Sequence, residues 1–469
     1  MSVLEQFTFC LRKIDWTDSR IIQIQMLRHQ SENEIFSFFI NQQRGFVMKT
    51  VAIIIFVLTY VLLLSLPRYR AQVALISASI FVILGIMPAG KVLSTIDWNV
   101  IFMIAGTMGI VSLFIDSKMP ALLADIIISK TPNVKWAVIS LALFAGIISA
   151  FVDNVATVIM VAPVALTICK KLGVSPVSSI IAIAVSSNLQ GAATLVGDTT
   201  SILLGNHADM NFFDFFFFQG KPSLFWIVQI GAIVSTFVLL WLFRNDTQPV
   251  DSDDRTMVTD FFPSFLLILM IILLITASFV PNTPKTINGI ICISLFFIGI
   301  VRSYVIKKNK ALVISALKDI DYITLLLLAG LFVVVGGISE VGVIEDIAKI
   351  FVSVSGDNLF LIYTILVWFS VLVSAFIDNI IYVATMLPVV GGIAALLGAD
   401  PYLLYFGLII GATLGGNMTP IGASANIAGI GILKKQGYEV TTGEFTRIGV
   451  PFTLAAVTSG YILTWLIFA

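Results

Sequence analysis

Charged residues are scarce in this sequence of 469 residues. They make up 12% of the chain, against about 25% in soluble domains, whereas 58% is hydrophobic and the mean hydropathy is +1.03. Apolar stretches such as 98–115 and 224–243 are long enough to cross about 30 Å of hydrocarbon as helices. The composition excludes an ordinary soluble domain and predicts an all-α polytopic membrane protein.

Cysteine and histidine are scarce as well. Cys10, Cys169 and Cys292 are far apart, so neither a disulfide framework nor a zinc site is indicated. The two histidines, His29 and His207, are too distant for a histidine proton relay. Because no nucleophile–base or metal constellation is visible, we expect no enzyme, and the zero formal net charge suggests no nucleic-acid partner. No ATP-binding motif is present, so we expect an ion gradient to drive any pumping.

The first 47 residues differ from the rest of the chain. They are mixed and polar and carry Arg12, Lys13, Arg20, Arg28 and Arg44. Met48 then opens the run MKTVAIIIFVLTY, which is typical of the start of an inner-membrane protein. We interpret 1–47 as an extension that arises from a mis-assigned start, with Met48 as the initiator. A genuine amphipathic cytoplasmic arm is the alternative.

A polar motif occurs twice within apolar surroundings. SAFVDNVATVIMVAP at 149–163 is followed by SAFIDNIIYVATMLP at 374–388, so each residue of the second copy lies 225 positions after its counterpart. LGVSP and LGADP, which end at Pro176 and Pro401, keep the same offset. This register predicts a duplication, with repeats at 48–243 and 261–469. The polar segment 244–260 between them reads as a cytoplasmic linker.

The basic residues set an expected topology. We place about ten spans, at 50–66, 71–87, 98–115, 177–205, 223–243, 261–280, 287–301, 322–339, 402–432 and 447–468, and two re-entrant hairpins, at 134–170 and 358–397. The positive-inside rule then makes one face cytoplasmic, the face of Arg68, Arg70, Lys170, Lys171, Arg244, Lys307, Lys308, Lys310, Lys434 and Lys435. Lys170 and Lys171 correspond to the neutral Ala395 and Leu396. Such swapped charge is typical of inverted-topology repeats.

Four interruptions of the apolar pattern are expected near the bilayer midplane. Two are the hairpin tips at Asp153-Asn154 and Asp378-Asn379, and two are the glycine-rich stretches 188–205 and 411–429. Backbone groups freed by a broken helix need partners from protein or from a water-filled cavity, so interruptions mark transport pathways. Small residues in membrane helices also serve close packing. A duplicated intramembrane aspartate, at roughly 2.5–3.5 kcal/mol each, indicates function instead.

Asp198 lies in the first glycine-rich stretch and carries a third intramembrane carboxylate. Its counterpart in the second repeat is Ala423. This asymmetry suggests a coupling-ion site in one half of the chain.

These motifs resemble a known family. SAFVDNVATVIMVAPV, SNLQGAATLVGDTTSILLGNHADMNFFDF and GATLGGNMTPIGASANIAG are similar to the arsenite-permease and P-protein branch of the ion transporter superfamily. That superfamily also includes citrate carriers and sodium/proton antiporters, and the resemblance covers 48–469. It implies two inverted repeats, each with a hairpin and a discontinuous helix that meet at a midplane site. It also implies elevator-type alternating access and a homodimer.

The resemblance assigns candidate substrate- and ion-binding positions in this sequence. The hairpin tips supply Asp153, Asn154, Thr157, Asp378 and Asn379, and the broken helices supply Gly197, Asp198, Thr199, Asn417, Thr419, Gly422, Ser424 and Asn426. The permease branch usually has two prolines and an asparagine after Gly-Asp, but this chain reads GDTTS. Antiporter relatives also place threonines there, so the motif leaves the substrate open.

Two functions follow from these residues. The first is a secondary active transporter of a small oxyanion or carboxylate, coupled to sodium or protons, in a bacterial cytoplasmic membrane. The midplane motifs contain no Lys or Arg, so cations would have to neutralise the aspartates around an anion. The alternative is a sodium/proton antiporter in which Asp153, Asp198 and Asp378 hold sodium or protons. Neither function needs a cofactor beyond the coupling ion.

Overall fold

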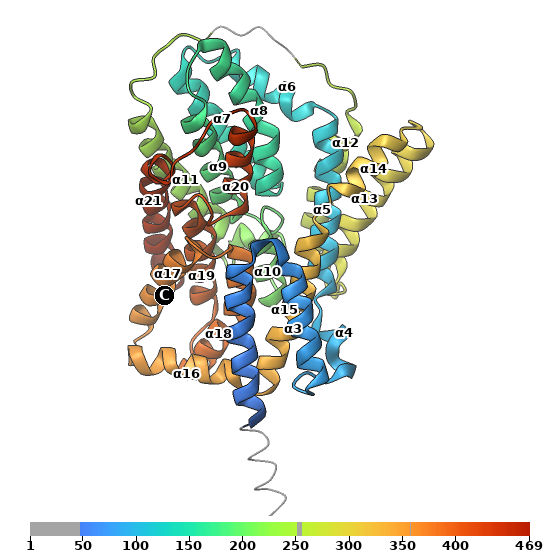
Figure 1. Ribbon diagram of the computed structural model, residues 1–469, viewed down its shortest axis with the longest axis vertical. Helices are drawn as coiled ribbons and strands as arrows, with labels where there is room; N and C mark the ends of the chain where they lie inside the picture. The colour runs from blue at the N-terminus through green and yellow to red at the C-terminus, as the bar shows by residue number, and fades with distance from the viewer. Residues whose placement is uncertain (1–46, 251–255, 357) are drawn as a thin grey trace, which may run out of the picture.

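The computed structural model describes residues 47–250, 256–356 and 358–469 (Figure 1). The described chain is mostly helical, and its strands are the two-residue β1 (Phe217–Phe218) and β2 (Lys221–Pro222). Eight described helices are long and apolar enough to cross a membrane, or nine if one bent pair forms a single span. The expected extension at 1–47 falls outside the described residues except for Val47, and part of the expected linker, 251–255, also lies outside them.

The α-helices of the two halves follow the same order, although the short 3-10 helices differ. The first contains the Val47–Ser65 helix, η1 (Pro67–Tyr69), α3 (Arg70–Ile83), η2 (Ala89–Lys91), α4 (Val92–Thr95), α5 (Trp98–Asp116), α6 (Met119–Ile128), α7 (Val134–Ser149), α8 (Asn154–Leu172), α9 (Val177–Gly191), α10 (Thr199–His207), η3 (Phe213–Phe215) and α11 (Leu224–Leu242). The second contains α12 (Phe262–Ser278), α13 (Ile287–Val305), α14 (Lys310–Lys318), α15 (Tyr322–Glu340), α16 (Val343–Ser355), α17 (Leu359–Ser374), α18 (Asn379–Leu397), α19 (Tyr402–Gly415), η4 (Gly416–Met418), α20 (Ser424–Lys435) and α21 (Thr442–Phe468).

Equivalent helices pack against each other in the two halves. α5 packs against α13, and its counterpart α15 packs against α3. Close approach at these two crossings depends on equivalent glycines. A Cβ on Gly106 would overlap the backbone of Cys292, and one on Gly330 would lie 2.7 Å from the backbone of Ala74. Small residues at helix crossings are the usual means of close packing in membranes.

The hairpin helices also match in detail. α8 and α18 each contain a proline, Pro163 and Pro388, and each ends at a glycine in the left-handed region, Gly173 and Gly398. Glycine is favoured there because it lacks a Cβ. Figure 1 shows α7 and α8 in the upper part of the molecule and α18 in the lower part. The two hairpins approach from opposite sides, as inverted repeats require.

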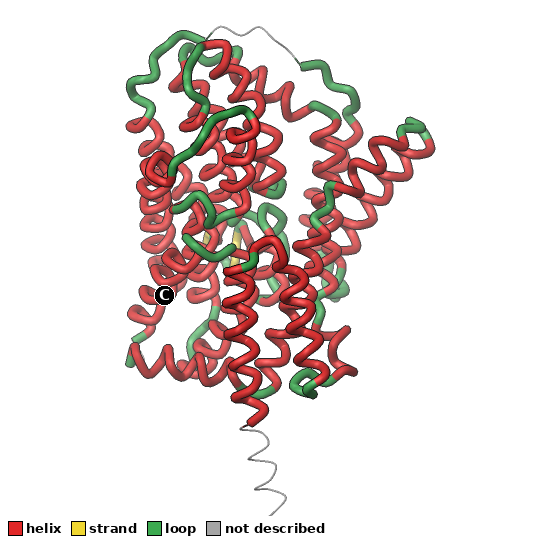
Figure 2. The backbone as a smooth tube through the Cα atoms, viewed as in Figure 1, coloured by secondary structure: helices red, strands yellow, loops and turns green. Residues whose placement is uncertain are grey.

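The interruptions lie where the sequence predicts them. The first hairpin turns between Ser149 and Asn154, and the second between Ser374 and Asn379. The expected spans 177–205 and 402–432 are discontinuous, because α9 and α10 are separated by a non-helical segment and α19 and α20 are separated by η4 and a turn. Figure 2 shows loop segments among the helices at half height. The discontinuous all-α architecture is confirmed.

We expect Gly106→Ala to destabilise the protein by about 1–3 kcal/mol, because the added methyl forces α5 away from α13. Thermal unfolding of purified protein in detergent measures the change. The matched control is Gly431→Ala within α20, where a Cβ meets no atom within 4 Å. Equal unfolding midpoints for the two variants would show that the α5–α13 crossing tolerates separation.

Candidate functional site

The hairpin tips are built around capping aspartates. Asp153 precedes α8, and its Oδ1 accepts hydrogen bonds from the backbone N–H groups of Val155 and Ala156 at 3.0 and 3.1 Å. Asp378 precedes α18, and its Oδ1 accepts from the N–H of Ile380 at 3.0 Å. A carboxylate in this position satisfies donors that a helix start leaves free. The duplicated aspartates therefore stabilise two helix starts at equivalent positions.

Asp198 caps the start of α10 and connects the two repeats. Its Oδ1 accepts from the N–H of Thr199 at 2.8 Å, and its Oδ2 accepts from the hydroxyl of Thr200 at 2.9 Å. The Nδ2 of Asn379, at the second hairpin tip, donates to the same Oδ2 at 3.2 Å. Ala423, the counterpart of Asp198, offers α20 no capping side chain. The carboxylate at this break is therefore specific to the first repeat.

A buried amide network links the first hairpin tip to both broken helices. Asn154 Nδ2 donates to Asn188 Oδ1 at 2.8 Å. Asn188 Nδ2 donates in turn to the carbonyl of Thr413 at 2.8 Å and to Asn417 Oδ1 at 3.1 Å. Asn417 Nδ2 donates to the carbonyl of Val185 at 3.0 Å. Asn188 has no exposed surface, so each bond lost there would leave a buried polar group without a partner.

Backbone carbonyls surround Gly197 at the first break. A Cβ at this glycine would lie 2.7 Å from the carbonyl oxygen of Gly191 and 2.9 Å from those of Ser149 and Ala150. The Thr194 hydroxyl also donates to the Ala150 carbonyl. The break thus brings oxygens from the hairpin and from α9 to one glycine, and carbonyls of unwound helices are sodium ligands in transporters.

Gly422 has the same surroundings in the second repeat. A Cβ there would lie 2.5 Å from the carbonyl oxygen of Gly416, 2.8 Å from that of Ala375 and 2.9 Å from that of Ser374. The Thr419 hydroxyl donates to the Ala375 carbonyl, as Thr194 does in the first repeat. We call these two groups of oxygens the first and second carbonyl cradles. Each cradle excludes every side chain larger than hydrogen.

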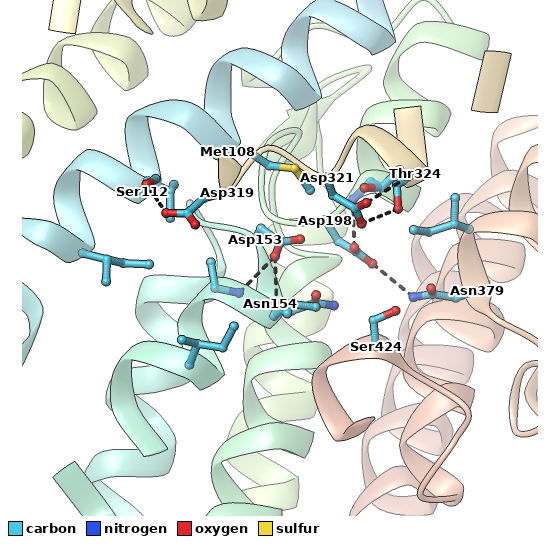
Figure 3. A pocket seen from close by; sticks show the side chains of 17 residues that line it. Met108, Ser112, Asp153, Asn154, Asp198, Asp319, Asp321, Thr324, Asn379 and Ser424 are labelled. Atoms are coloured by element: carbon cyan, nitrogen blue, oxygen red, sulfur yellow. Dashed lines mark hydrogen bonds between the residues drawn. The ribbon is translucent and has the colours of Figure 1, made fainter. Parts of the chain in front are cut away.

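A cavity of about 280 Å³ lies between the hairpin tips and the helices α5 and α15 (Figure 3). The first residues of four helices line it: Asn154 of α8, Thr199 of α10, Asn379 of α18 and Ser424 of α20. The described residues of its lining also include four aspartates, with no Lys or Arg among them, and these aspartates are Asp153, Asp198, Asp319 and Asp321. The cavity joins helix starts, which favour anions, to carboxylates, which favour cations.

Asp319 and Asp321 were not recognised from the sequence. Asp319 Oδ2 accepts from the Ser112 hydroxyl at 2.6 Å, and Asp321 caps α15 by accepting from the N–H of Thr324 at 3.0 Å. Asp321 lies in IDYITLLLLAG at 320–330, which resembles IDWNVIFMIAG at 96–106 in the first repeat, so its counterpart is Asp97. That match identifies a helix cap. It does not reveal that the start of α15 faces the first hairpin tip.

The basic pattern of the sequence places Arg70 in a loop of the cytoplasmic face, and the structure corrects this prediction. Its Nη1 lies 3.0 Å from Asp378 Oδ2, at the second hairpin tip. The Ser424 hydroxyl donates to the same oxygen at 3.3 Å. The reason is that the Val47–Ser65 helix and the start of α3 pack on the start of α18. Leu63 and Ala71 share a hydrophobic cluster with Ile381, and Tyr60 donates to the Ile381 carbonyl at 3.3 Å. Arg70 is therefore a partner of the site.

The remaining candidate residues divide into two groups. Thr199 and Ser424 line the cavity. Thr157, Thr419 and Asn426 lie behind it and bond to backbone carbonyls, Thr157 to Asp153 at 3.0 Å and Asn426 to Gly416 at 3.0 Å. In the described part of the chain, no three His, Cys, Asp or Glu side chains are close enough together to hold one metal ion.

Comparisons with known proteins agree with these features. The profile of the citrate transporter family matches residues 54–408. An uncharacterized transporter of Mycobacterium tuberculosis is 32% identical over 438 residues, which cover 89% of this chain and 98% of the relative. The P protein of Sus scrofa is 24% identical over 505 residues, which cover 88% of this chain and 58% of that protein.

A solved structure shows a similar fold. The YdaH transporter of Alcanivorax borkumensis, whose topology is described as unusual, matches 80% of this chain and 87% of its own with a TM-score of 0.55 at 15% identity. The chain belongs to the citrate transporter family. It is an integral membrane transporter and not an enzyme, and its bacterial relatives place it in a bacterial cytoplasmic membrane. The resemblance to the ion transporter superfamily is confirmed.

We expect Asn188→Ala to lower the free energy of unfolding by about 1–3 kcal/mol, because the partners of the lost amide stay buried. The midpoint of thermal unfolding in detergent reports the effect. Ser353→Ala is the control, since that exposed hydroxyl bonds within its own helix and its loss should change stability by less than about 0.5 kcal/mol. If both variants unfold like the wild type, the amide network does not hold the repeats together.

Proposed function

We propose that this transporter moves a small carboxylate or oxyanion by secondary active transport, coupled to sodium ions or protons that bind at the first repeat. The observation that carries the proposal is the cavity in which four helix starts and four aspartates meet. Helix starts favour anions and carboxylates favour cations, so the same cavity suits a substrate anion together with its coupling ion.

The coupling ion is assigned to the first repeat because two cavity aspartates and a carbonyl cradle lie together there, whereas Asp319 and Asp321 belong to the second repeat and lie at the start of α15, away from both cradle glycines in sequence. Asp153 and Asp198 both line the cavity, and the first carbonyl cradle lies directly beside Asp198 at Gly197. Carboxylate and carbonyl oxygens are ligands for sodium, and a carboxylate alone can take up a proton. Either ion would neutralise charge that otherwise repels an anion.

The substrate anion is assigned to the start of α20. Asp153, Asp198 and Asp378 cap α8, α10 and α18, but Ala423 leaves α20 without a side-chain cap. The first N–H groups of α20 are therefore available to an anionic group, next to the Ser424 hydroxyl in the cavity wall. The description of the matching family, a citrate transporter, favours a carboxylate.

A sodium/proton antiporter is the second candidate. The observation in its favour is that the cavity lining contains four aspartates and no Lys or Arg. An exchange of sodium for protons needs no anion at all, since the same carboxylates can bind each ion in turn.

Purified protein in proteoliposomes distinguishes the two candidates. We expect citrate uptake that a sodium or proton gradient drives, and we expect Asp153→Asn and Asp198→Asn each to reduce it roughly 30- to 150-fold, as loss of a charge-assisted contact of about 2–3 kcal/mol implies. The measurement is uptake of labelled citrate with each gradient imposed separately.

The control is the same preparation without any organic or oxyanion substrate. Sodium-driven acidification or alkalinisation under that condition, lost in Asp153→Asn and Asp198→Asn, would replace the anion proposal with the antiporter. Uptake that both aspartate variants retain in full would contradict a coupling site at the first repeat.

A further inference from the structure

Arg70 forms an ion pair inside the site region, at the second hairpin tip. Its Nη1 lies 3.0 Å from Asp378 Oδ2, and the two side chains are 21% and 8% exposed. The arginine stands at the start of α3, directly after the turn formed by η1. Leu63 and Ala71, which flank this turn, pack with Ile381 at the start of α18. The guanidinium is therefore held against the second tip by packing as well as by charge.

The first hairpin tip has no such partner. Asp153 accepts from backbone N–H groups, and Asp198 accepts from Thr199, Thr200 and Asn379. Among the ion pairs found in the described residues, neither Asp153 nor Asp198 takes part. Both carboxylates line the cavity, and none of the described residues that line it supplies an opposite charge.

The two carbonyl cradles are nevertheless alike. Gly197 and Gly422 are 225 positions apart, and so are the carbonyls that surround them. The repeats differ in the charges beside the cradles. The first cradle has Asp153 and Asp198 beside it, whereas the second has the neutral Ala423 and Asp378, which pairs with Arg70 of the first repeat. The first cradle thus has two uncompensated carboxylates beside it, and the second has one carboxylate, which Arg70 of the first repeat balances.

We propose that Arg70 is a tethered counter-ion at the second hairpin tip, which takes the electrostatic place of a mobile cation and leaves the first repeat as the single cation site. This inference rests on the proposed function, because it presumes that the first repeat binds the coupling cation. The inference implies that each chain takes up a single cation at the site, in the first repeat. It also predicts that removal of the guanidinium opens a second cation site at Asp378.

Thermal unfolding of the purified full-length chain tests the inference. Sodium chloride replaces choline chloride at constant ionic strength and about pH 8.5. This pH is far above the pKa of an ordinary aspartate, so protons compete little with sodium for a carboxylate. The slope of the unfolding midpoint against the logarithm of sodium concentration reports the number of bound ions. For Arg70→Gln we expect a slope about twofold that of the wild type.

Matched variants assign the added site. Arg70→Gln/Asp378→Asn removes both charges and should return the slope to that of the wild type, and Arg70→Lys, which keeps the charge, should not change it. An Arg70→Gln slope equal to the wild-type slope would overturn the inference. A slope that stays above the wild-type slope in the Arg70→Gln/Asp378→Asn variant would also overturn it.

A variant of the first repeat keeps the inference testable if Arg70→Gln does not fold. Asp198→Asn should abolish the sodium dependence of the otherwise wild-type protein, because no second mobile cation is present. If Asp198→Asn keeps half of the wild-type slope, a second mobile cation binds to the protein. That result would overturn the role of Arg70 and leave the first-repeat site in place. A wild-type protein without any sodium dependence would instead contradict a sodium site at the first repeat, and the difference between Arg70→Gln and the double variant would still decide the role of Arg70.

Discussion

A helix interrupted within hydrocarbon must satisfy its free backbone groups inside the protein, and the rest of this structure depends on that constraint. Asp153, Asp198 and Asp378 accept hydrogen bonds from the N–H groups of α8, α10 and α18. The carbonyls at the breaks gather around Gly197 and Gly422. The groups that stabilise the interruptions therefore also create a polar, acid-lined cavity where the two repeats meet.

The two repeats share the backbone scaffold of this site and differ in the charged residues that determine its chemistry. Helix caps, carbonyl cradles and close helix crossings recur in both halves. The charges do not, since Asp198 corresponds to Ala423 and Arg70 compensates Asp378. A symmetric backbone with an asymmetric charge distribution supports the proposal that one repeat holds a cation and the other presents an uncapped helix start to an anion.

The sequence was sufficient for features that depend on local pattern. The repeat register located both hairpin tips and both broken helices, and the motifs indicated the correct superfamily. It was not sufficient for Arg70, Asp319 and Asp321, which reach the site through contacts between distant helices. Arg70 lies 308 positions from Asp378, so periodicity and hydropathy carry no signal for that pair. The charge count that assigns topology treats such a residue as part of a loop.

The most direct measurement of the central claim is the accessibility of the cavity to water. Ala156 lines the cavity, whereas Ala142 of α7 has no exposed surface, and each is replaced by cysteine in a chain whose own cysteines are serine. We expect a membrane-impermeant maleimide to modify Ala156→Cys from one face of the membrane, sodium with citrate to slow that reaction, and Ala142→Cys to remain unmodified. An Ala156→Cys variant that is unreactive from both faces, or that reacts at a rate unaffected by these ions, would contradict a transport site at the meeting of the two repeats.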